Sequence, residues 1–183
     1  MILHWDQLVL YYGAEISRHR PLFEAAGQTT HALLCCRSAP DDVRLSSGSG
    51  EHAEDRILQS ENWRVHLPCA LANWTPLNNP IVVTLAINRS PCGSCARLLS
   101  NALNELHRQF PLRCEQNRFI LASRGVYEDA NMIAATRRSD LVRLLDAGWE
   151  LCVLQVGSQL PARAQILLQG LEDLGQRGFV RLG

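Results

Sequence analysis

The sequence predicts an α/β domain in which one sheet lies between helices on both faces. From residue 28 onward, apolar runs of strand length alternate with segments of helical periodicity, and such alternation is typical of α/β folds. The run IVVTLAI, residues 81–87, is continuously apolar and rich in β-branched residues. Such a run is expected of a strand buried on both faces. Strands joined by a single helix are expected to be parallel.

The elements before residue 81 are short. Four segments have helix or strand periodicity: a helix or irregular strand at 3–12, a helical turn closed by glycine at 21–27, a strand at 30–36 and a helix at 51–62. Residues 39–50 are rich in Pro, Asp, Ser and Gly and are predicted to be a loop. Residues 63–80, which contain three prolines, are predicted to be a second loop.

After residue 81 the alternation is regular. The predicted elements are helices at 95–110, 138–148 and 162–175, and strands at 118–123 and 149–156. Pro111 is expected to end the first of these helices. Ser139 is the candidate N-cap of the second helix. Gly148 and Gly175 are expected to close the second and third helices.

Composition and charge restrict the class of protein. A length of 183 residues, with 46% apolar and 20% charged residues, is ordinary for one globular domain. The net charge is zero, so no global basic field indicates a nucleic acid or a membrane surface as partner. The chain begins without a cationic leader, and no apolar run reaches spanning length. Seven cysteines, an odd number, favour a reducing compartment, and we expect a cytoplasmic protein.

The stretch SPCGSC, residues 90–95, follows the buried strand and begins a helix. Two cysteines three residues apart at a helix start direct their sulfur atoms to nearly the same side. Unpaired backbone N–H groups and the helix dipole at that point favour thiolate over thiol. Cys92 and Cys95 therefore supply half of the ligands that a zinc ion needs.

The stretch EHAEDRIL, residues 51–58, supplies the complementary chemistry. His52 begins another helix and becomes a third ligand if both helix starts lie at the carboxyl edge of the sheet, where α/β folds bind ligands. Three protein ligands leave a fourth position for water, as in catalytic zinc sites. Glu54 is not needed as a ligand. Its carboxylate can take a proton from that water and pass it to a leaving amine.

The two stretches read HAE at 52–54 and PCGSC at 91–95. They match the H-x-E…P-C-x-x-C signature of zinc-dependent nucleobase deaminases. Either half alone is a weak signal, but both in this order, each at the start of a predicted helix, are a strong one. A structural zinc site, a chance pairing and a nucleophilic cysteine beside His52 are the alternatives. His66 and Cys69 have the spacing of a second ligand pair without a partner pair.

On these motifs the chain resembles the cytidine deaminase superfamily, nearest to its AID/APOBEC-like branch, and bacterial toxin deaminases are similar to the same pattern. The resemblance covers residues 28 to 157 approximately and includes NRSPCGSCARLL, FILASRGVYE and LVRLLDAGWELCVL. It implies a three-layer fold with a five-stranded mixed sheet, a Zn²⁺ cofactor, and a hydrolase that acts on the C–N bonds of cyclic amidines. The implied reaction converts cytosine to uracil in single-stranded nucleic acid, with DNA favoured over RNA. A helix between the last two strands is similar to the branch that acts on polynucleotides.

The resemblance also implies substrate-binding residues. Tyr127 falls where the family places an aromatic ring against the target base, and Glu128 falls where it reads the 5′ neighbour. Ala53 and Ser90 fall where backbone groups hold the base edge. Relatives often have an aromatic residue at the position of Arg89, so the arginine is a departure from the family pattern. It is a candidate substrate-binding residue through contact with a phosphate, and a different substrate is the alternative.

Three further arginines are candidates for contact with a phosphate backbone, namely Arg124, Arg137 and Arg138, and a solvated surface is the alternative. His31 is interpreted as a packed histidine rather than as part of the pocket rim. Because of Arg89 and the neutral charge, a deaminase of free nucleosides, nucleotides or another small amine is the second hypothesis. A zinc-bearing binding module without turnover is the third.

The expected organisation is one domain with three parts. Residues 1–27 form an N-terminal extension that packs on the core, residues 28–157 form the deaminase core, and residues 158–183 form a C-terminal helix of the same domain. If the chain is a toxin domain, an immunity protein is its expected partner.

Overall fold

The computed structural model describes residues 1–25, 29–36, 43–48, 52–126 and 134–182. These residues form one mixed sheet with the strand order β1-β6-β5-β4-β2-β3. The strands are β1 (Ile2–His4), β2 (Thr30–Cys36), β3 (Val43–Gly48), β4 (Val82–Ile87), β5 (Arg118–Ser123) and β6 (Glu150–Gln155). Five of them, β2 to β6, form the predicted five-stranded mixed sheet, and β1 from the N-terminal extension adds a sixth at the edge.

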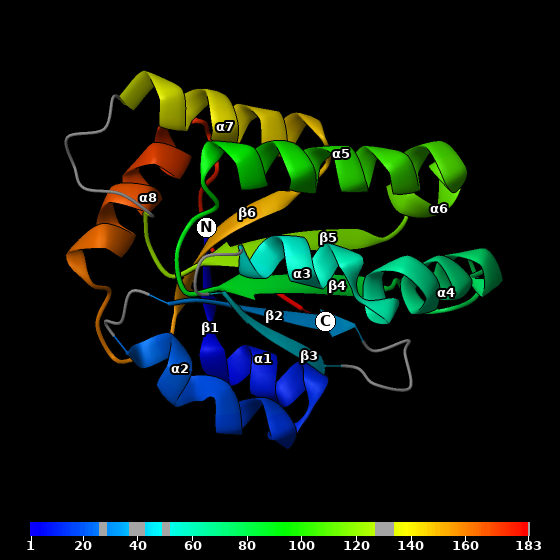
Figure 1. Cartoon of the computed structure of the whole chain (residues 1–183), viewed down its shortest axis with the longest axis horizontal. Helices are drawn as coiled ribbons and strands as arrows, with labels where there is room; N and C mark the ends of the chain where they lie inside the picture. The colour runs from blue at the N-terminus through cyan, green and yellow to red at the C-terminus, as the bar shows by residue number, and fades with distance from the viewer. Residues whose placement is uncertain (26–28, 37–42, 49–51, 127–133, 183) are drawn as a thin grey trace.

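Helices cover both faces of the sheet, which confirms the predicted three-layer α/β/α fold (Figure 1). The α-helices are α1 (Trp5–Tyr12), α2 (Arg20–Glu24), α3 (Ala53–Gln59), α4 (Leu67–Asn73), α5 (Gly93–Gln109), α6 (Pro111–Glu115), α7 (Ala134–Asp146) and α8 (Ala162–Asp173). A 3-10 helix, η1 (Ala14–His19), precedes α2, and a π-helix, η2 (Asn62–His66), precedes α4.

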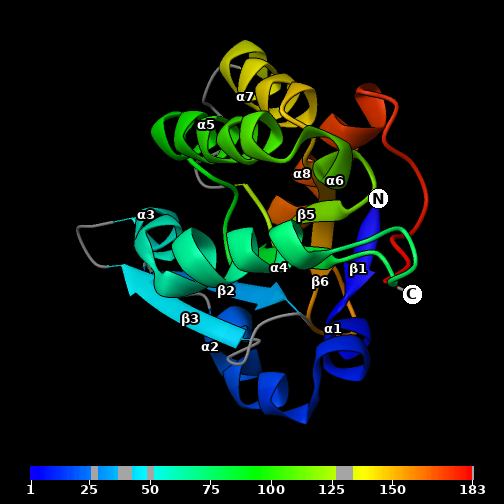
Figure 2. The same cartoon turned by 90° about the vertical axis from the view of Figure 1, so that its right-hand side faces the viewer.

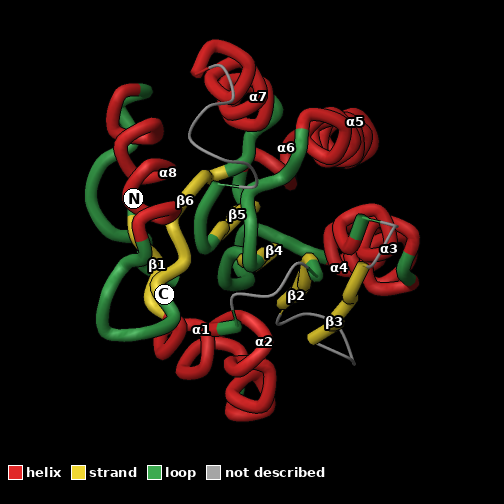
Figure 3. Tube along the Cα trace, turned by 60° about the vertical axis from the view of Figure 1, so that its left-hand side comes forward, coloured by secondary structure: helices red, strands yellow, loops and turns green. Residues whose placement is uncertain are grey.

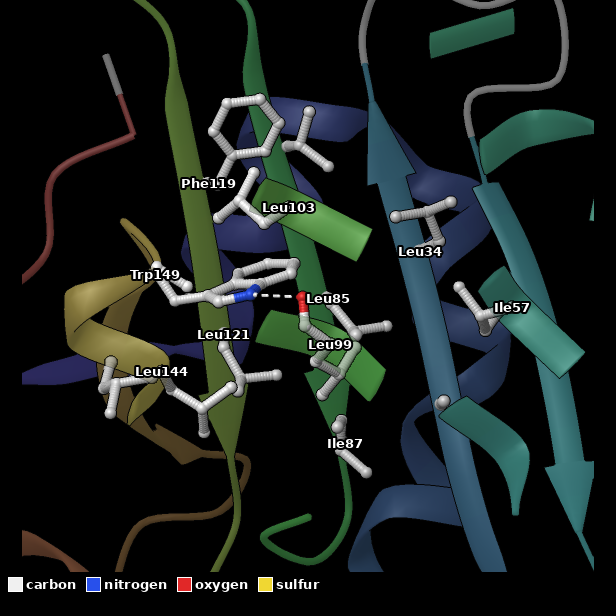
Figure 4. Packing of buried hydrophobic residues seen from close by; sticks show 14 of the residues in the cluster. Leu34, Ile57, Leu85, Ile87, Leu99, Leu103, Phe119, Leu121, Leu144 and Trp149 are labelled. Carbon is white, nitrogen blue, oxygen red and sulfur yellow. Dashed lines mark hydrogen bonds between the residues drawn. The ribbon is translucent and has the colours of Figure 1, made fainter. Parts of the chain in front are cut away.

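One face of the sheet packs against α3, α4, α5, α7 and α8. Successive residues of a strand point to opposite faces, so Leu85 of β4 packs with Leu99 and Leu103 of α5 on this side (Figure 4). The indole Nε1–H of Trp149 donates a hydrogen bond of 3.1 Å to the carbonyl of Leu99. This hydrogen bond satisfies a polar group that would otherwise be costly to bury.

The N-terminal extension forms the layer on the opposite face. Leu8, Ile16 and Phe23 pack in one buried cluster with Leu33 of β2 and Ala86 of β4. In Figure 3, α1 and α2 lie on the side of the sheet away from α3, α4 and α5. The extension therefore covers one whole side of the central strands.

The prediction of a loop over residues 39–50 is wrong for residues 43–48. Val43–Gly48 form β3, which pairs antiparallel with β2 and lies at the sheet edge. A short segment rich in Ser and Gly has weak strand propensity, so its conformation depends on the hydrogen-bonding edge that β2 offers. The sequence of residues 39–50 itself does not indicate that this edge is available.

The missed strand also changes the direction of β2. A single helix between 30–36 and 81–87 predicts parallel strands, but β2 and β4 are antiparallel. Because β3 reverses the chain, it is β3 that runs in the same direction as β4. The connection between these two strands contains α3, η2 and α4. In Figure 2 the arrows of β2 and β3 point in opposite directions. The predicted parallel relation holds for β4 with β5 and for β5 with β6.

Residues 63–80, predicted to be a loop, contain most of η2 and all of α4. Pro68 lies in the first turn of α4, where a helix needs no N–H donor, so this proline is compatible with the helix. Trp63, Leu67 and Leu71 are all buried. Their spacing of four residues forms one apolar face, which the prolines obscured in the sequence.

Several helix boundaries differ from the predicted ones. The helix expected from residue 138 begins at Ala134, so Ser139 lies inside α7 and is not its N-cap. Pro111 ends α5 as expected and also begins α6. Gly148 has φ 99° and Gly175 has φ 80°, in the left-handed region that favours glycine after a helix. α2 ends at Glu24, and Gly27 lies outside the described residues.

Among the described residues, no helix combines the length and the apolar character that crossing a bilayer requires.

Candidate metal centre

Two helix starts meet at one edge of the sheet. His52 directly precedes α3 in an extended conformation, with φ −76° and ψ 131°. Cys92 precedes α5 in the same way, with φ −70° and ψ 168°, and Cys95 lies in the first turn of α5. β3 and β4 run in the same direction, so the chain leaves both strands at the same edge. This common direction explains how residues forty positions apart come together.

The three predicted ligands lie close enough to hold one metal ion. Their ligand atoms all lie within 4.8 Å of one another, and the Sγ atom of Cys92 is 3.6 Å from Nδ1 of His52. Two ligands of a tetrahedral zinc ion are about 3.5–3.8 Å apart, given Zn–S and Zn–N bonds of about 2.3 and 2.0 Å. The described residues contain no second group of three or more such ligands. The predicted proximity of His52, Cys92 and Cys95 is therefore confirmed.

Solvent exposure decreases from His52 through Cys92 to Cys95. His52 is exposed, Cys92 is half-buried and Cys95 is fully buried. An ion held by these residues would therefore have protein on the Cys95 side and solvent access on the His52 side. Such access is a property of catalytic rather than closed structural zinc sites.

Glu54 lies in the first turn of α3 and is only 2% exposed. Its Oε2 atom has no hydrogen-bond partner in the described part of the chain. Burial raises the pKa of this carboxyl group, against the opposing effects of a backbone hydrogen bond, the charge of His52 and a hydrogen bond with Cys95. Buried polar atoms almost always have a partner, so an oxygen without one at this depth is unusual and is available to a group that binds beside it.

The pKa of the Cys95 thiol is raised as well. Burial raises the pKa of its thiol, and the neighbouring charges of Glu54 and Cys92 raise it further. A divalent cation reverses this balance because it favours the thiolate and attracts the carboxylate. Two sulfur atoms and one imidazole nitrogen form a donor set that zinc prefers. The residues present therefore fit zinc.

The loop at residues 89–92, here called the cysteine loop, carries Cys92 and is held from two sides. The side chain of Asn88 accepts a hydrogen bond of 2.9 Å from the N–H of His31 and donates one of 3.0 Å to the carbonyl of Thr29. The N–H of Ser90 donates a bond of 2.5 Å to the carbonyl of Gly125. The Oγ and Sγ atoms of Ser94 and Cys92 are 3.0 Å apart, as expected of a hydroxyl that orients a ligand sulfur.

Asn88, Ser94 and Gly125 contribute to the site but are not among the residues predicted from the sequence. Asn88 had a detectable signal, because it is a polar residue at the carboxyl end of a buried strand, directly before the cysteine loop. Ser94 lies inside the signature at a position that the signature leaves free. Gly125 had no signal of its own, since its importance comes from a helix that follows much later in the chain.

The predicted substrate residues have different placements. Ala53 is buried beside His52, and Ser90 and Arg89 are half-buried in the cysteine loop. Arg124 donates hydrogen bonds to the carbonyls of Phe23 and Ala25, the latter at 3.5 Å, so its guanidinium group joins the end of β5 to the end of α2. Burial lowers its pKa.

The remaining predicted residues are not part of this arrangement. Tyr127 and Glu128 lie outside the described residues, as does the side chain of Arg137. Arg138 is exposed on α7. His31 is half-buried in β2, and desolvation lowers its pKa.

His66 and Cys69 lie apart from the metal cluster. They line a surface cavity of about 530 Å³ beside α4, together with Trp74 and neighbouring asparagines. The described residues supply no third ligand to this pair. In the described part of the chain, this pair therefore lacks the third ligand that would make it comparable with residues 52, 92 and 95.

The chain matches no family model, and no curated protein is significantly similar to it.

Proposed function

We propose that the protein is a zinc-dependent hydrolase that deaminates cytosine to uracil in single-stranded nucleic acid, with DNA as the favoured polymer. The observation that carries the proposal is the placement of Glu54. A buried carboxylate with an unpaired oxygen lies beside one imidazole and two thiols that can share a metal ion. A purely structural zinc site needs no such acid.

The residues of the site divide into metal ligands, a residue that orients a ligand, and residues that bind the base. His52, Cys92 and Cys95 would hold the ion, and the O–H of Ser94 would orient the Cys92 sulfur. Zinc in such a site lowers the pKa of coordinated water to about 7 and acts as a Lewis acid. Ala53 and Ser90 would bind the edge of the base through their backbone groups.

Glu54 would carry the protons. Deamination adds water to C4 of the cytosine ring and breaks the C4–N bond, so one proton of the water must move to ring N3 and the other to the leaving nitrogen, which departs as ammonia. A buried carboxylate that hydrogen-bonds to the ligand Cys95 suits this task because it can accept a proton and give it up again beside the ion. The unpaired Oε2 of Glu54 is the atom to which we assign the transfer.

The geometry of the cluster supports an unpaired substrate base. Cys95 is fully buried at the start of α5, so a base must leave any stack to reach an ion at this depth. Arg89 and Arg138 are the arginines that we assign to phosphate contacts. Arg124 supports the edge of the site instead, because its guanidinium group is bonded to α2.

A deaminase of free nucleosides or of another small amine is the second candidate, and two observations favour it. The chain has no net charge. The guanidinium group of Arg124 donates hydrogen bonds to backbone carbonyls, so it is not available to bind a polymer. Such an enzyme would use the same four residues, so the two candidates differ in substrate and not in mechanism.

The test is a deamination assay on single-stranded DNA, RNA, duplex DNA and free cytidine. We expect C-to-U conversion on the single strand, and conversion of free cytidine alone would favour the second candidate. Glu54→Ala should reduce conversion by at least about a hundredfold, because proton transfer by a positioned side chain contributes that much, while zinc remains bound. Zinc without conversion of any substrate in the parent protein would instead indicate a binding module.

A further inference from the structure

The cysteine loop is connected to the C-terminal helix through the end of β5. The N–H of Ser90 donates to the carbonyl of Gly125 at 2.5 Å, and the N–H of Val126 donates to the carbonyl of Arg163 at 3.2 Å. Arg163 lies in the first turn of α8. Three segments far apart in the sequence, 88–92, 124–126 and 161–164, are therefore joined by backbone hydrogen bonds.

Gly125 makes this contact possible because it has no side chain. A Cβ atom at this position would lie 2.9 Å from Cβ of Arg163, 3.1 Å from its carbonyl carbon and 3.2 Å from the nitrogen of Ala164. The φ angle of Gly125 is not in the left-handed region. The requirement for glycine here is thus one of space between two backbones and not one of backbone conformation.

We propose that Gly125 is a positioning residue for the metal centre, and that the first turn of α8 supports the cysteine loop through it. The proposal rests on the proposed use of Cys92 and Cys95 as zinc ligands. Pro91 is the single residue between Ser90 and Cys92, and its ring restricts φ. A displacement at Ser90 is therefore transmitted to the first sulfur rather than absorbed by the loop.

The consequence is that metal affinity depends on a helix outside the signature. A side chain at 125 must push α8 away or move the carbonyl that Ser90 uses. Either change misplaces the Cys92 sulfur relative to His52. Changes to groups that orient metal ligands typically cost 10- to 100-fold in metal affinity.

The test compares Gly125→Ala with Gly157→Ala in the full chain. Gly157 lies in the loop after β6, and a Cβ atom there would meet nothing within 4 Å, so it controls for the added methyl group. Zinc affinity is measured by competition with a chromophoric chelator, and the site is also loaded with Co²⁺ to record its thiolate absorption. We expect Gly125→Ala to weaken zinc binding at least about tenfold and to alter the Co²⁺ spectrum, with Gly157→Ala unchanged in both. Parental affinity and spectrum in Gly125→Ala overturn the proposal.

A second measurement on the parent protein decides the matter if Gly125→Ala does not fold. Coupling between two sites is reciprocal, so zinc must stabilise the contact that supports the zinc site. Zinc should slow hydrogen exchange at the Val126 amide, which bonds to Arg163. Zinc should slow exchange less at the Val180 amide, which bonds to Ile2 at the opposite sheet edge. Equal effects at both amides overturn the proposal.

These outcomes separate this proposal from the proposed function. A parent protein that binds zinc without deaminating any substrate refutes the deaminase and leaves the role of Gly125 intact. An active parent whose Gly125→Ala variant binds zinc normally refutes the role of Gly125 alone.

Discussion

At the scale of single residues, Glu54 occupies a position that stability alone would not select. The side chain is almost fully buried, one carboxylate oxygen has no partner in the described part of the chain, and burial raises the pKa of the group. Burial of a charged group without full compensation costs stability. Residues that are costly to the fold and perturbed in pKa are concentrated at functional sites.

This cost has a defined pH dependence in the metal-free protein. Because the folded-state pKa of Glu54 lies above its ordinary value of 4.5, the folded protein holds the proton more tightly than the unfolded chain does. The resulting stability is present below about pH 4.5 and is lost as the pH rises through the folded-state pKa. We therefore expect Glu54→Gln to raise the stability of the chelator-treated protein at pH 7, and this gain should vanish near pH 4.

Urea unfolding at the two pH values measures the effect. Glu115→Gln is the matched control, because Glu115 is an exposed carboxylate on α6, and it should change stability little at either pH. A Glu54→Gln variant that is no more stable than the parent at pH 7 would contradict this account of the carboxylate.

At the scale of elements, α5 both presents a predicted metal ligand and packs in the core. Its first turn presents Cys95 to the metal centre, and its remaining turns bury Leu99, Leu103 and Leu106 under the sheet face formed by β4 and β5. The packing fixes the axis of the helix, and the axis in turn fixes where the cysteine sulfur lies. Elements that both pack and present ligands place functional groups more accurately than free loops do.

The packing of α5 predicts a contrast between two of its leucines. Leu103→Ala removes a fully buried side chain and should cost about 2–5 kcal/mol, since it leaves a cavity in a close-packed core. Leu98→Ala changes a side chain that is 42% exposed on the same helix, and should cost well under about 1 kcal/mol. Denaturant unfolding of the two variants provides the comparison, and equal losses would mean that α5 is not packed as described.

At the scale of the whole molecule, the chain folds around two cores that share one sheet. The larger core lies under α3 to α8 and includes Leu85 and Trp149, and the other lies under the N-terminal extension and includes Trp5 and Leu8. The metal ligands come from the starts of α3 and α5, two helices that pack in the larger core. Binding of an ion that joins α3 to α5 should therefore stabilise the molecule as a unit.

Zinc removal tests this expectation. A ligand that binds the folded state alone stabilises it by about 2.7 kcal/mol at one hundred times its Kd, so zinc should raise the melting temperature of the apoprotein by several degrees. Cys92→Ser should lose most of this zinc-dependent increase. Cys69→Ser should keep it, because Cys69 is exposed and lies outside the cluster. An equal increase in both variants would place the ion elsewhere.

Local sequence determined much of this protein. The apolar runs at 30–36, 81–87 and 118–123 became strands because burial favours them wherever they pair. The residue types at 52, 92 and 95 determined the ligand set, because only soft sulfur and imidazole donors form it. These features depend on side-chain chemistry and short-range periodicity, which the sequence displays directly.

Tertiary structure alone decided how these pieces meet. β3 exists because β2 offers an edge to a segment with weak propensity of its own, and the reversal at β3 brings His52 to the edge where β4 delivers Cys92. The approach of α8 to Gly125 and the contact of Arg124 with α2 are likewise decided by segments distant in the chain. Such contacts depend on the closure of long loops and on pairing between remote backbones, and no local pattern encodes either.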